Sequence, residues 1–344
     1  MTKAIRIRRA SLTWRLRHLV TALALLGLAG AAALLALDLG SYPIRALDLR
    51  AALGSEMAAI PRMILLDHRL PRILVALGAG AALGLSGAIF QSMLRNPLAS
   101  PDVIGFNAGA SCGAVLAVLV YGSARMVLPW ALTGGLLTAA LVLALAWDRR
   151  PGGGLDPYRL ILIGIGASLT LGATGDLLMS MTDENRAADM AQWLVGSLNA
   201  RSLSDAALVW GGLALLCPAL IWLHFPLSRM TLSDDMARSF GLPLPFLRLC
   251  LTVLGVLLAA LAVSVAGPLP FVAFVAGPVA RRLLGTGAPV LLAAALVGAL
   301  VTLGADTAAR LVPMVQLPAG VFTALLGAPV LMALLIAQTR KGAL

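Results

Sequence analysis

Charged residues are scarce in this sequence. Only 12% of its 344 residues are Asp, Glu, Lys or Arg, and 60% are hydrophobic. A soluble domain contains about 25% charged and about 45–50% apolar residues. A water-soluble globule of this size could not bury so much apolar surface. The composition therefore excludes an ordinary soluble enzyme, and it equally excludes a disordered chain, which would be polar.

Residue types that carry catalysis or bind metals are also few. The sequence holds three cysteines and three histidines, and it contains neither a GxxxxGK[ST] phosphate-binding loop nor an HExxH zinc motif. The cysteines are odd in number and lie in apolar runs, so we interpret Cys112, Cys217 and Cys250 as small core residues. These absences predict a chain that is not an enzyme and binds neither a cofactor nor a metal itself.

Long apolar runs are abundant. A helix needs about 20 apolar residues to cross a bilayer. The first run, Leu19 to Leu37, is uncharged and exceeds the about 7–15 residues of a signal-peptide core, so we predict a membrane helix there. The fold class predicted is all-α, a polytopic membrane protein with about ten transmembrane helices, at 18–37, 72–93, 103–121, 127–147, 160–181, 204–224, 248–267, 271–286, 288–310 and 318–338.

The basic residues predict the orientation in the membrane. Lys and Arg are enriched in cytoplasmic loops. With a cytoplasmic N-terminus, 17 of the 26 basic residues fall inside and nine outside. We therefore predict that both termini are cytoplasmic, with a basic N-terminus at 1–17, a transmembrane domain at 18–338 and a C-terminus at 339–344. Nine outer arginines are more than orientation alone favours, which suggests a use for them outside.

Two acidic residues, Asp176 and Asp306, lie well inside predicted spans. Carboxylates within the membrane are costly and often functional. Asp306 and Arg310 are four residues apart, so they share one helix face and predict a neutralising pair near the outer edge. A proton-coupling role for Asp306 is the alternative, and Asp176 has no evident local partner. A proton- or ion-coupled secondary transporter that uses these carboxylates therefore remains open.

A short polar stretch at 233–243 predicts a helix between two spans on the cytoplasmic face. Asp234 and Asp235 can cap its start and complement its dipole, whereas Gly241 and Pro243 end it. Such a helix is either a simple surface element or a docking site for a cytoplasmic partner.

Glycines are dense in two of the predicted spans. They allow helix backbones to approach closely in lipid. The sequence does not distinguish packing from sliding between helices at these glycines, which are Gly78, Gly80, Gly84 and Gly87 in the second span and Gly164, Gly166, Gly172 and Gly175 in the fifth.

Several longer motifs occur in a fixed order along the chain. They are RLPR at 69–72, SGAIFQSMLRNPLASPDVIGFNAGA at 86–110, ARSFGLP at 237–243, GPLPFVAFVAGPVARRLLG at 267–285, GADTAARL at 304–311 and QLPAGVFTALLGAPV at 316–330. From about residue 15 onward the chain resembles permease subunits of the FecCD family, the type II ATP-binding-cassette (ABC) importers for ferric siderophores, haem and cobalamin.

This resemblance implies a function and a set of partners. It implies the type II ABC importer permease fold and the import of ferric siderophore complexes across the cytoplasmic (inner) membrane. Haem and cobalamin remain alternative cargoes. The implied partners are an extracytoplasmic binding protein, a second permease subunit (identical or paralogous) and two cytoplasmic ATPase subunits, which would bind the ATP and Mg²⁺. A nucleic-acid partner is not expected.

The resemblance also implies roles for individual residues. Arg69, Arg72 and Arg310 would receive acidic residues of the binding protein, and Asn96 and Leu98 would belong to a cytoplasmic gate. The helix that couples to the ATPase would include Asp234, Asp235, Ala237, Arg238 and Gly241.

The sequence departs from the family pattern in the eighth span. A Pro-His pair often precedes Ala-Arg in the family, but here the chain reads Gly277-Pro278-Val279-Ala280-Arg281. The histidine is missing, and Pro278 predicts a helix break because it cannot donate a backbone hydrogen bond.

Overall fold

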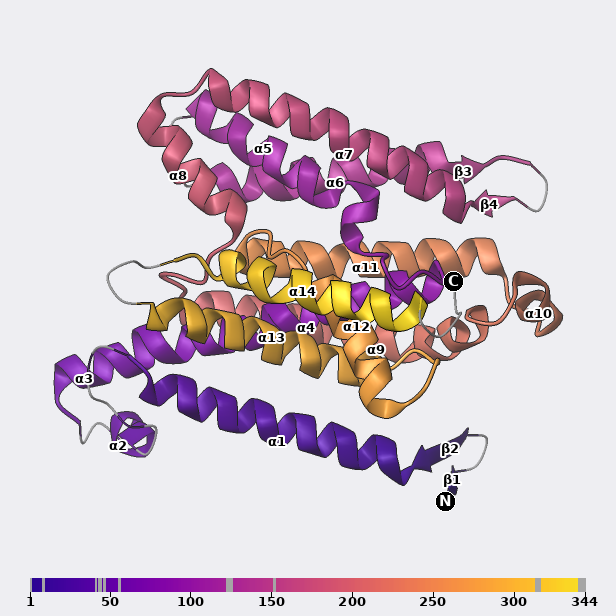
Figure 1. Cartoon of the computed structure of the whole chain (residues 1–344), viewed down its shortest axis with the longest axis horizontal. Coiled ribbons are helices and arrows are strands. Elements are labelled where there is room, and N and C mark those ends of the chain that lie inside the picture. Colours follow the sequence, from indigo (N-terminus) through magenta and orange to yellow (C-terminus); the bar gives the residue numbers. More distant parts are fainter. Residues whose placement is uncertain are drawn as a thin grey trace.

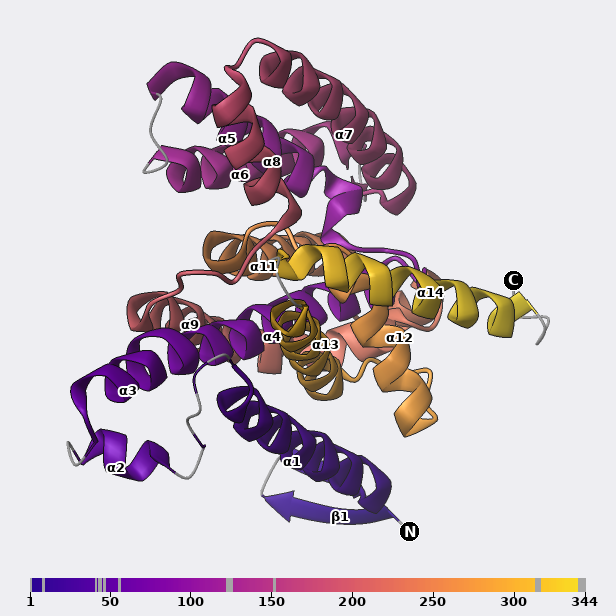
Figure 2. The same ribbon diagram turned by 60° about the vertical axis from the view of Figure 1, so that its left-hand side comes forward.

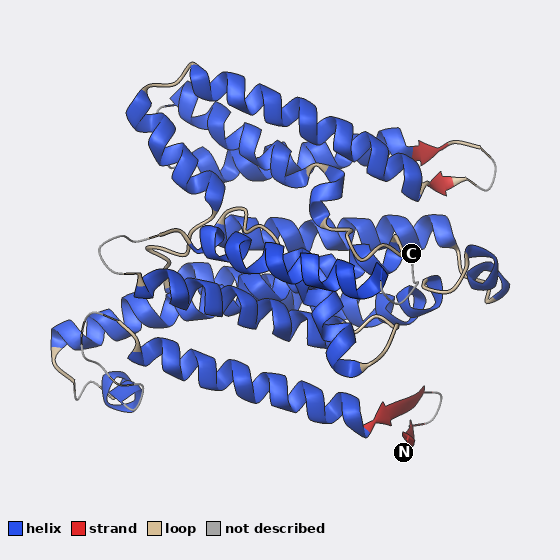
Figure 3. Ribbon diagram, viewed as in Figure 1, coloured by secondary structure: helices blue, strands red, loops and turns tan. Residues whose placement is uncertain are grey.

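The computed structural model describes residues 2–7, 10–40, 42, 45, 48–54, 57–121, 126–150, 153–312 and 317–339. Most of the predicted C-terminal segment, residues 340–344, lies outside the described residues. The chain is mostly helical, with two small antiparallel hairpins (Figure 3).

Each predicted apolar segment overlaps one helix. These helices are α1 (Leu16–Asp38), α4 (Leu70–Met93), α5 (Phe106–Tyr121), α6 (Val127–Ala146), α7 (Pro157–Ser180), α9 (Leu203–Met230), α11 (Leu244–Ala266), α12 (Val272–Leu284), α13 (Leu291–Leu311) and α14 (Ala319–Thr339). Within the described residues, seven helices are long and apolar enough to cross a membrane, whereas α5 and the apolar part of α14 are shorter. Helix α12 has only 13 residues and carries Arg281 and Arg282.

Shorter elements connect the long helices. They are α2 (Leu49–Leu53), α3 (Ala59–Met63), the π-helical turn η2 (Ile64–Arg69), the 3-10 turn η3 (Pro101–Ile104), α8 (Glu184–Val195) and α10 (Asp234–Ser239). Strand β1 (Thr2–Ile7) pairs with β2 (Ala10–Arg15), and β3 (Trp147–Asp148) pairs with β4 (Gly154–Leu155). Neither the hairpins nor α8 was predicted from the sequence.

The second span begins earlier than predicted. We expected it to start at residue 72, but α3, η2 and α4 form one continuous helix from Ala59 to Met93. Pro71 does not end this helix. The preceding turn widens to π geometry, in which the Leu70 amide donates to the Leu65 carbonyl, five residues back. The RLPR motif therefore lies within this continuous helix.

Helix α4 forms the centre of the molecule and packs against α9, α11, α12 and α13 (Figure 1). Its glycines explain this close packing. A Cβ at Gly84 would overlap the Ala294 carbonyl of α13, and a Cβ at Gly87 would overlap the Ala273 carbonyl of α12. Backbone contact of this kind is what small residues permit between membrane helices.

The glycines of α7 behave differently. A Cβ at Gly164 would overlap the Val103 carbonyl, but a Cβ at Gly166, Gly172 or Gly175 would meet no atom of another element within 4 Å in the described part of the chain. Helices α5, α6 and α7 pack on one another as a second group, in the upper part of Figures 1 and 2, with α7 outermost.

The long helices give the molecule two opposite ends. We call one the α8 end, where α2, α3 and α8 lie, and the other the α10 end, where α10, the β3–β4 hairpin and the N-terminal hairpin lie (Figure 1). The α8 end contains Arg69, Arg72 and Arg310, three of the arginines predicted outside, and the α10 end contains the short helix predicted inside.

Candidate functional site

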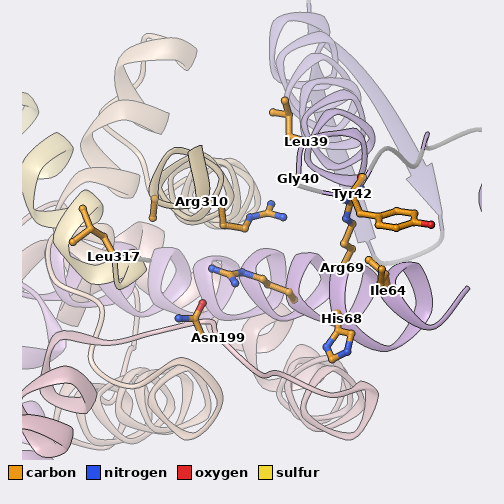
Figure 4. Close-up of a pocket in the computed structure, with 11 residues that line it drawn as sticks. Leu39, Gly40, Tyr42, Ile64, His68, Arg69, Asn199, Arg310 and Leu317 are labelled. Carbon is orange, nitrogen blue, oxygen red and sulfur yellow. The ribbon is translucent and has the colours of Figure 1, made fainter. Parts of the chain in front are cut away.

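A pocket of about 290 Å³ opens at the α8 end. The segment that follows α1, the turn η2 with the start of α4, and the end of α13 all contribute to it, so the fold brings together the three arginines predicted to dock the binding protein. In Figure 4 the Arg310 side chain leaves α13 and points toward the side of the pocket that Arg69 lines. The lining residues are Leu39, Gly40, Tyr42, Ile64, His68, Arg69, Arg72, Asn199, Ala309, Arg310 and Leu317.

Asp306 lies behind this pocket and is fully buried. Nε and Nη2 of Arg72 donate to its two carboxylate oxygens, with a shortest distance of 2.7 Å. Nε of Arg310 lies 3.3 Å from Oδ2. The predicted Asp306–Arg310 pair is thus confirmed, but Arg72 is the closer partner. One carboxylate neutralises two guanidinium groups only partly, which leaves the pocket positively charged.

Arg69 is held in a different way. Its side chain is buried, with Nη1 donating to the Leu37 carbonyl and Nη2 to the Tyr42 carbonyl, both at 2.6 Å. The last carbonyls of a helix lack partners within the helix. Arg69 therefore joins the end of α1 to the α4 helix, while also lining the pocket.

A further arginine, Arg201, lies close to this cluster and was not predicted as a site residue. It precedes α9, and its Nη2 donates to the Ser197 carbonyl at 3.1 Å. Burial lowers the pKa of the Arg201 guanidinium, the carboxylate of Asp205 raises it, and the positive charge of Arg72 lowers it again. Its one sequence signal was its place among the nine outer arginines.

The short helix α10 is present at the opposite end. The Ser233 hydroxyl accepts from the Met236 amide at 3.2 Å and caps its start. Gly241 ends it with φ +74°, in the left-handed region that favours glycine. Ala237 is buried, whereas Asp235 and Arg238 are exposed. The helix thus presents charged residues to its surroundings.

The predicted gate residues lie in the turn after α4. The Leu98 amide donates to Asn96 Oδ1 at 2.9 Å, and the Ala99 amide donates to the Asn96 carbonyl at 3.1 Å. Leu98 is 38% exposed. Asn96 therefore shapes a compact turn that presents the Leu98 side chain.

The predicted helix break at Pro278 is wrong. Helix α12 continues through the proline, which removes the amide that would bond the Phe274 carbonyl four residues back. Nε2 of Gln91 donates to the carbonyls of Phe274 and Ala273, at 3.0 and 3.2 Å. Arg281 in turn donates to Gln91 Oε1 at 3.1 Å. A side chain from α4 thus satisfies the carbonyl that the proline leaves free, a known way of tolerating proline in membrane helices.

Asp176 belongs neither to the arginine pocket at the α8 end nor to α10. It lies on α7, where its side chain is exposed in the isolated chain.

Comparison with known proteins agrees with this architecture. The sequence profile of the FecCD transport family matches residues 25–337. The chain belongs to the FecCD transport family.

Relatives and a solved structure extend the FecCD match. The chain is 39% identical to the ferric enterobactin transport system permease protein FepG of Escherichia coli (strain K12), over 94% of this chain and 98% of that protein. It is 38% identical to the Fe(3+)-citrate import system permease protein YfmE of Bacillus subtilis (strain 168), over 81% and 83%. A metal-chelate type ABC transporter in an inward-facing conformation superposes with a TM-score of 0.79 at 28% identity, covering 93% of this chain and 99% of that one.

These matches establish the class of this FecCD protein. It is a membrane permease subunit of the ABC importer type, and the ATPase is a separate subunit. The alternative of a proton- or ion-coupled transporter does not agree with this class, and Asp306, one of the two carboxylates on which it rested, is engaged by two arginines.

Proposed function

We propose that this permease moves ferric siderophore complexes from an extracytoplasmic binding protein into the cytoplasm, across the cytoplasmic (inner) membrane. Relatives named for ferric enterobactin and for Fe(3+)-citrate support a ferric chelate as the cargo. Haem and cobalamin are the alternative cargoes. The working complex would contain a second permease subunit and two ATPase subunits that bind ATP and Mg²⁺.

The observation that carries this proposal is the arginine pocket at the α8 end. Arg72 and Arg310 retain 16% and 17% side-chain exposure, so an incoming carboxylate can reach them. Arginine–carboxylate bonds are directional, and the attraction between charged surfaces speeds docking and weakens with salt. A binding protein that must dock specifically and then leave suits such a surface.

The α10 end would receive the ATPase. Asp235 and Arg238 belong to the exposed helix α10, which protrudes from the bundle (Figure 1), and Gly241 follows its end. The turn at Asn96 and Leu98 lies at the same end and would act as the cytoplasmic gate.

The test is uptake into proteoliposomes that contain the permease, its partner permease and the ATPase. We expect uptake of a labelled ferric siderophore to need both ATP and the loaded binding protein. Arg310→Gln should lower uptake on the order of tenfold by weakening docking of the binding protein. The fold should be retained, because Arg72 still bonds both oxygens of Asp306. Arg159→Gln, at the α10 end, is the matched control.

Each alternative gives a different result. Uptake driven by a proton gradient without ATP would overturn the proposal. ATP-dependent uptake of haem or cobalamin, but of no ferric siderophore, would change the cargo and keep the mechanism. Docking by Arg310→Gln that equals the wild type would remove Arg310 from the docking surface.

A further inference from the structure

An ion-pair cluster joins α10 to the turn predicted as the gate. Asp234, the first residue of α10, lies between two arginines from different elements. Arg248 of α11 donates through Nη2 to Oδ2 at 2.6 Å, and Arg95 donates through Nη2 to Oδ1. Arg248 is 12% exposed and Asp234 is 34% exposed, so this cluster is partly shielded from water.

Arg95 connects three segments through one side chain. It lies just after α4 and immediately before Asn96, and its Nε donates to the carbonyl of Met230, the last residue of α9, at 3.0 Å. Its backbone has φ +50°, a conformation that residues other than glycine rarely adopt. The bonds to Met230 and Asp234 help to hold the turn in this strained form.

The carboxylate of Asp234 stays charged at neutral pH. Burial raises its pKa, but the hydrogen bonds and positive charges of Arg248 and Arg95 outweigh burial and hold the pKa below its ordinary value. Because both partners are permanently charged arginines, the cluster persists across the physiological pH range.

The other ion pair of α10 cannot make such a connection. Arg238 and Asp235 lie 3.8 Å apart on the same helix and are 62% and 95% exposed. That pair stays within α10, whereas Asp234 bonds outward to the end of α4 and to α11.

We propose that the cluster of Arg95, Asp234 and Arg248 is the mechanical link that passes a displacement of α10 to the turn at Asn96–Leu98. This inference rests on the proposed function, in which α10 contacts the ATPase and the turn forms the gate. Arg95 is a positioning residue. Its side chain bonds Met230 and Asp234, and it acts by holding the gate turn to the helix that moves.

The first experiment follows the gate itself and needs no cargo. In a complex whose three cysteines are replaced, Leu98→Cys is labelled with a membrane-impermeant thiol reagent, with and without ATP and vanadate. We expect ATP to change the labelling rate in the parent, and Arg95→Gln or Asp234→Asn to reduce that change on the order of tenfold. Arg95→Lys should restore part of the response, because an ammonium group can still pair with Asp234.

Two controls separate linkage from folding. Arg159→Gln removes an arginine whose ion pair, with Asp156 at 4.0 Å, lies within the start of α7, and it should keep the full response. The double variant Arg95→Gln with Asp234→Asn should respond no worse than either single variant. Each single variant already breaks the same Arg95–Asp234 ion pair. Co-purification with the ATPase and an unchanged melting temperature show that the variants fold.

The second experiment measures coupling. ATP hydrolysis and uptake are recorded in the same proteoliposomes, and Arg95→Gln should hydrolyse ATP at a rate near that of the parent while taking up less substrate per ATP. A wild-type labelling response in Arg95→Gln, or a proportional loss of hydrolysis and uptake, would overturn the link. An ATP-dependent labelling change in a parent that takes up no ferric chelate would instead leave the link standing and reject the proposed cargo.

Discussion

At the scale of single residues, Asp306 is the most constrained group of the candidate site. Its side chain is fully buried and shared by two arginines from two helices. Arg72 contributes a two-pronged bond that suits the planar carboxylate. The carboxylate thus serves as the counter-charge of two largely buried arginines.

We predict that Asp306→Asn destabilises the protein. The change leaves Arg72 and Arg310 partly buried without a counter-charge, and breaking such a pair costs about 3 kcal/mol. The melting temperature of the detergent-solubilised protein measures this loss. Asp183→Asn is the control, because its pair with Arg186 is a 3.7 Å contact with the Asp183 side chain 79% exposed, and exposed pairs contribute little. Equal melting temperatures for the two variants would contradict the interpretation.

At the scale of elements, the contact between α4 and α13 depends on glycine. A Cβ at Gly298 would overlap the Gly80 carbonyl, and a Cβ at Gly80 would overlap the Gly298 carbonyl. Close packing therefore explains why residues 80 and 298 are glycines. At this point the backbones of α4 and α13 are in direct contact.

Gly298→Ala should therefore lower stability by about 1–3 kcal/mol, since the added methyl group forces the two backbones apart. Gly304→Ala is a matched control on the same helix, because nothing lies near a Cβ there and alanine favours helix. Thermal unfolding of both variants measures the difference. A stable Gly298→Ala protein would mean that α4 and α13 can separate at little cost.

Two features of the fold, the early start of the second span and the helix α8, could not be predicted from hydropathy. The extension of the second span to Ala59 depends on a π-helical turn before Pro71, which hydropathy does not reveal. Helix α8 is short and carries both polar and apolar residues, so it lacks the apolar run by which spans were recognised.

At the scale of the whole molecule, the two ends carry different charge clusters. The arginine pocket lies at the α8 end, and the cluster of Arg95, Asp234 and Arg248 lies at the α10 end. The positive-inside bias predicts that the α10 end is cytoplasmic.

Cysteine labelling tests this orientation. In a background without Cys112, Cys217 and Cys250, Asp183→Cys at the α8 end should react with an impermeant maleimide on intact spheroplasts. Arg238→Cys at the α10 end should react only after the membrane is opened. Both positions are exposed, so access to the reagent and not burial decides the result. The opposite pattern would invert the proposed direction of transport.

Local sequence patterns were enough to predict the helical membrane class, the places of the long helices, the pairing of Asp306 with Arg310 and the short helix at α10. Each of these depends on hydropathy or on spacings of a few residues along one helix. The tertiary structure alone showed that Arg72 binds Asp306 across 234 positions, that Arg69 holds the end of α1, that Gln91 satisfies the carbonyl freed by Pro278, and that Arg95 reaches Asp234. These contacts join segments distant in the chain, and they arise only when α4 is packed among its neighbours.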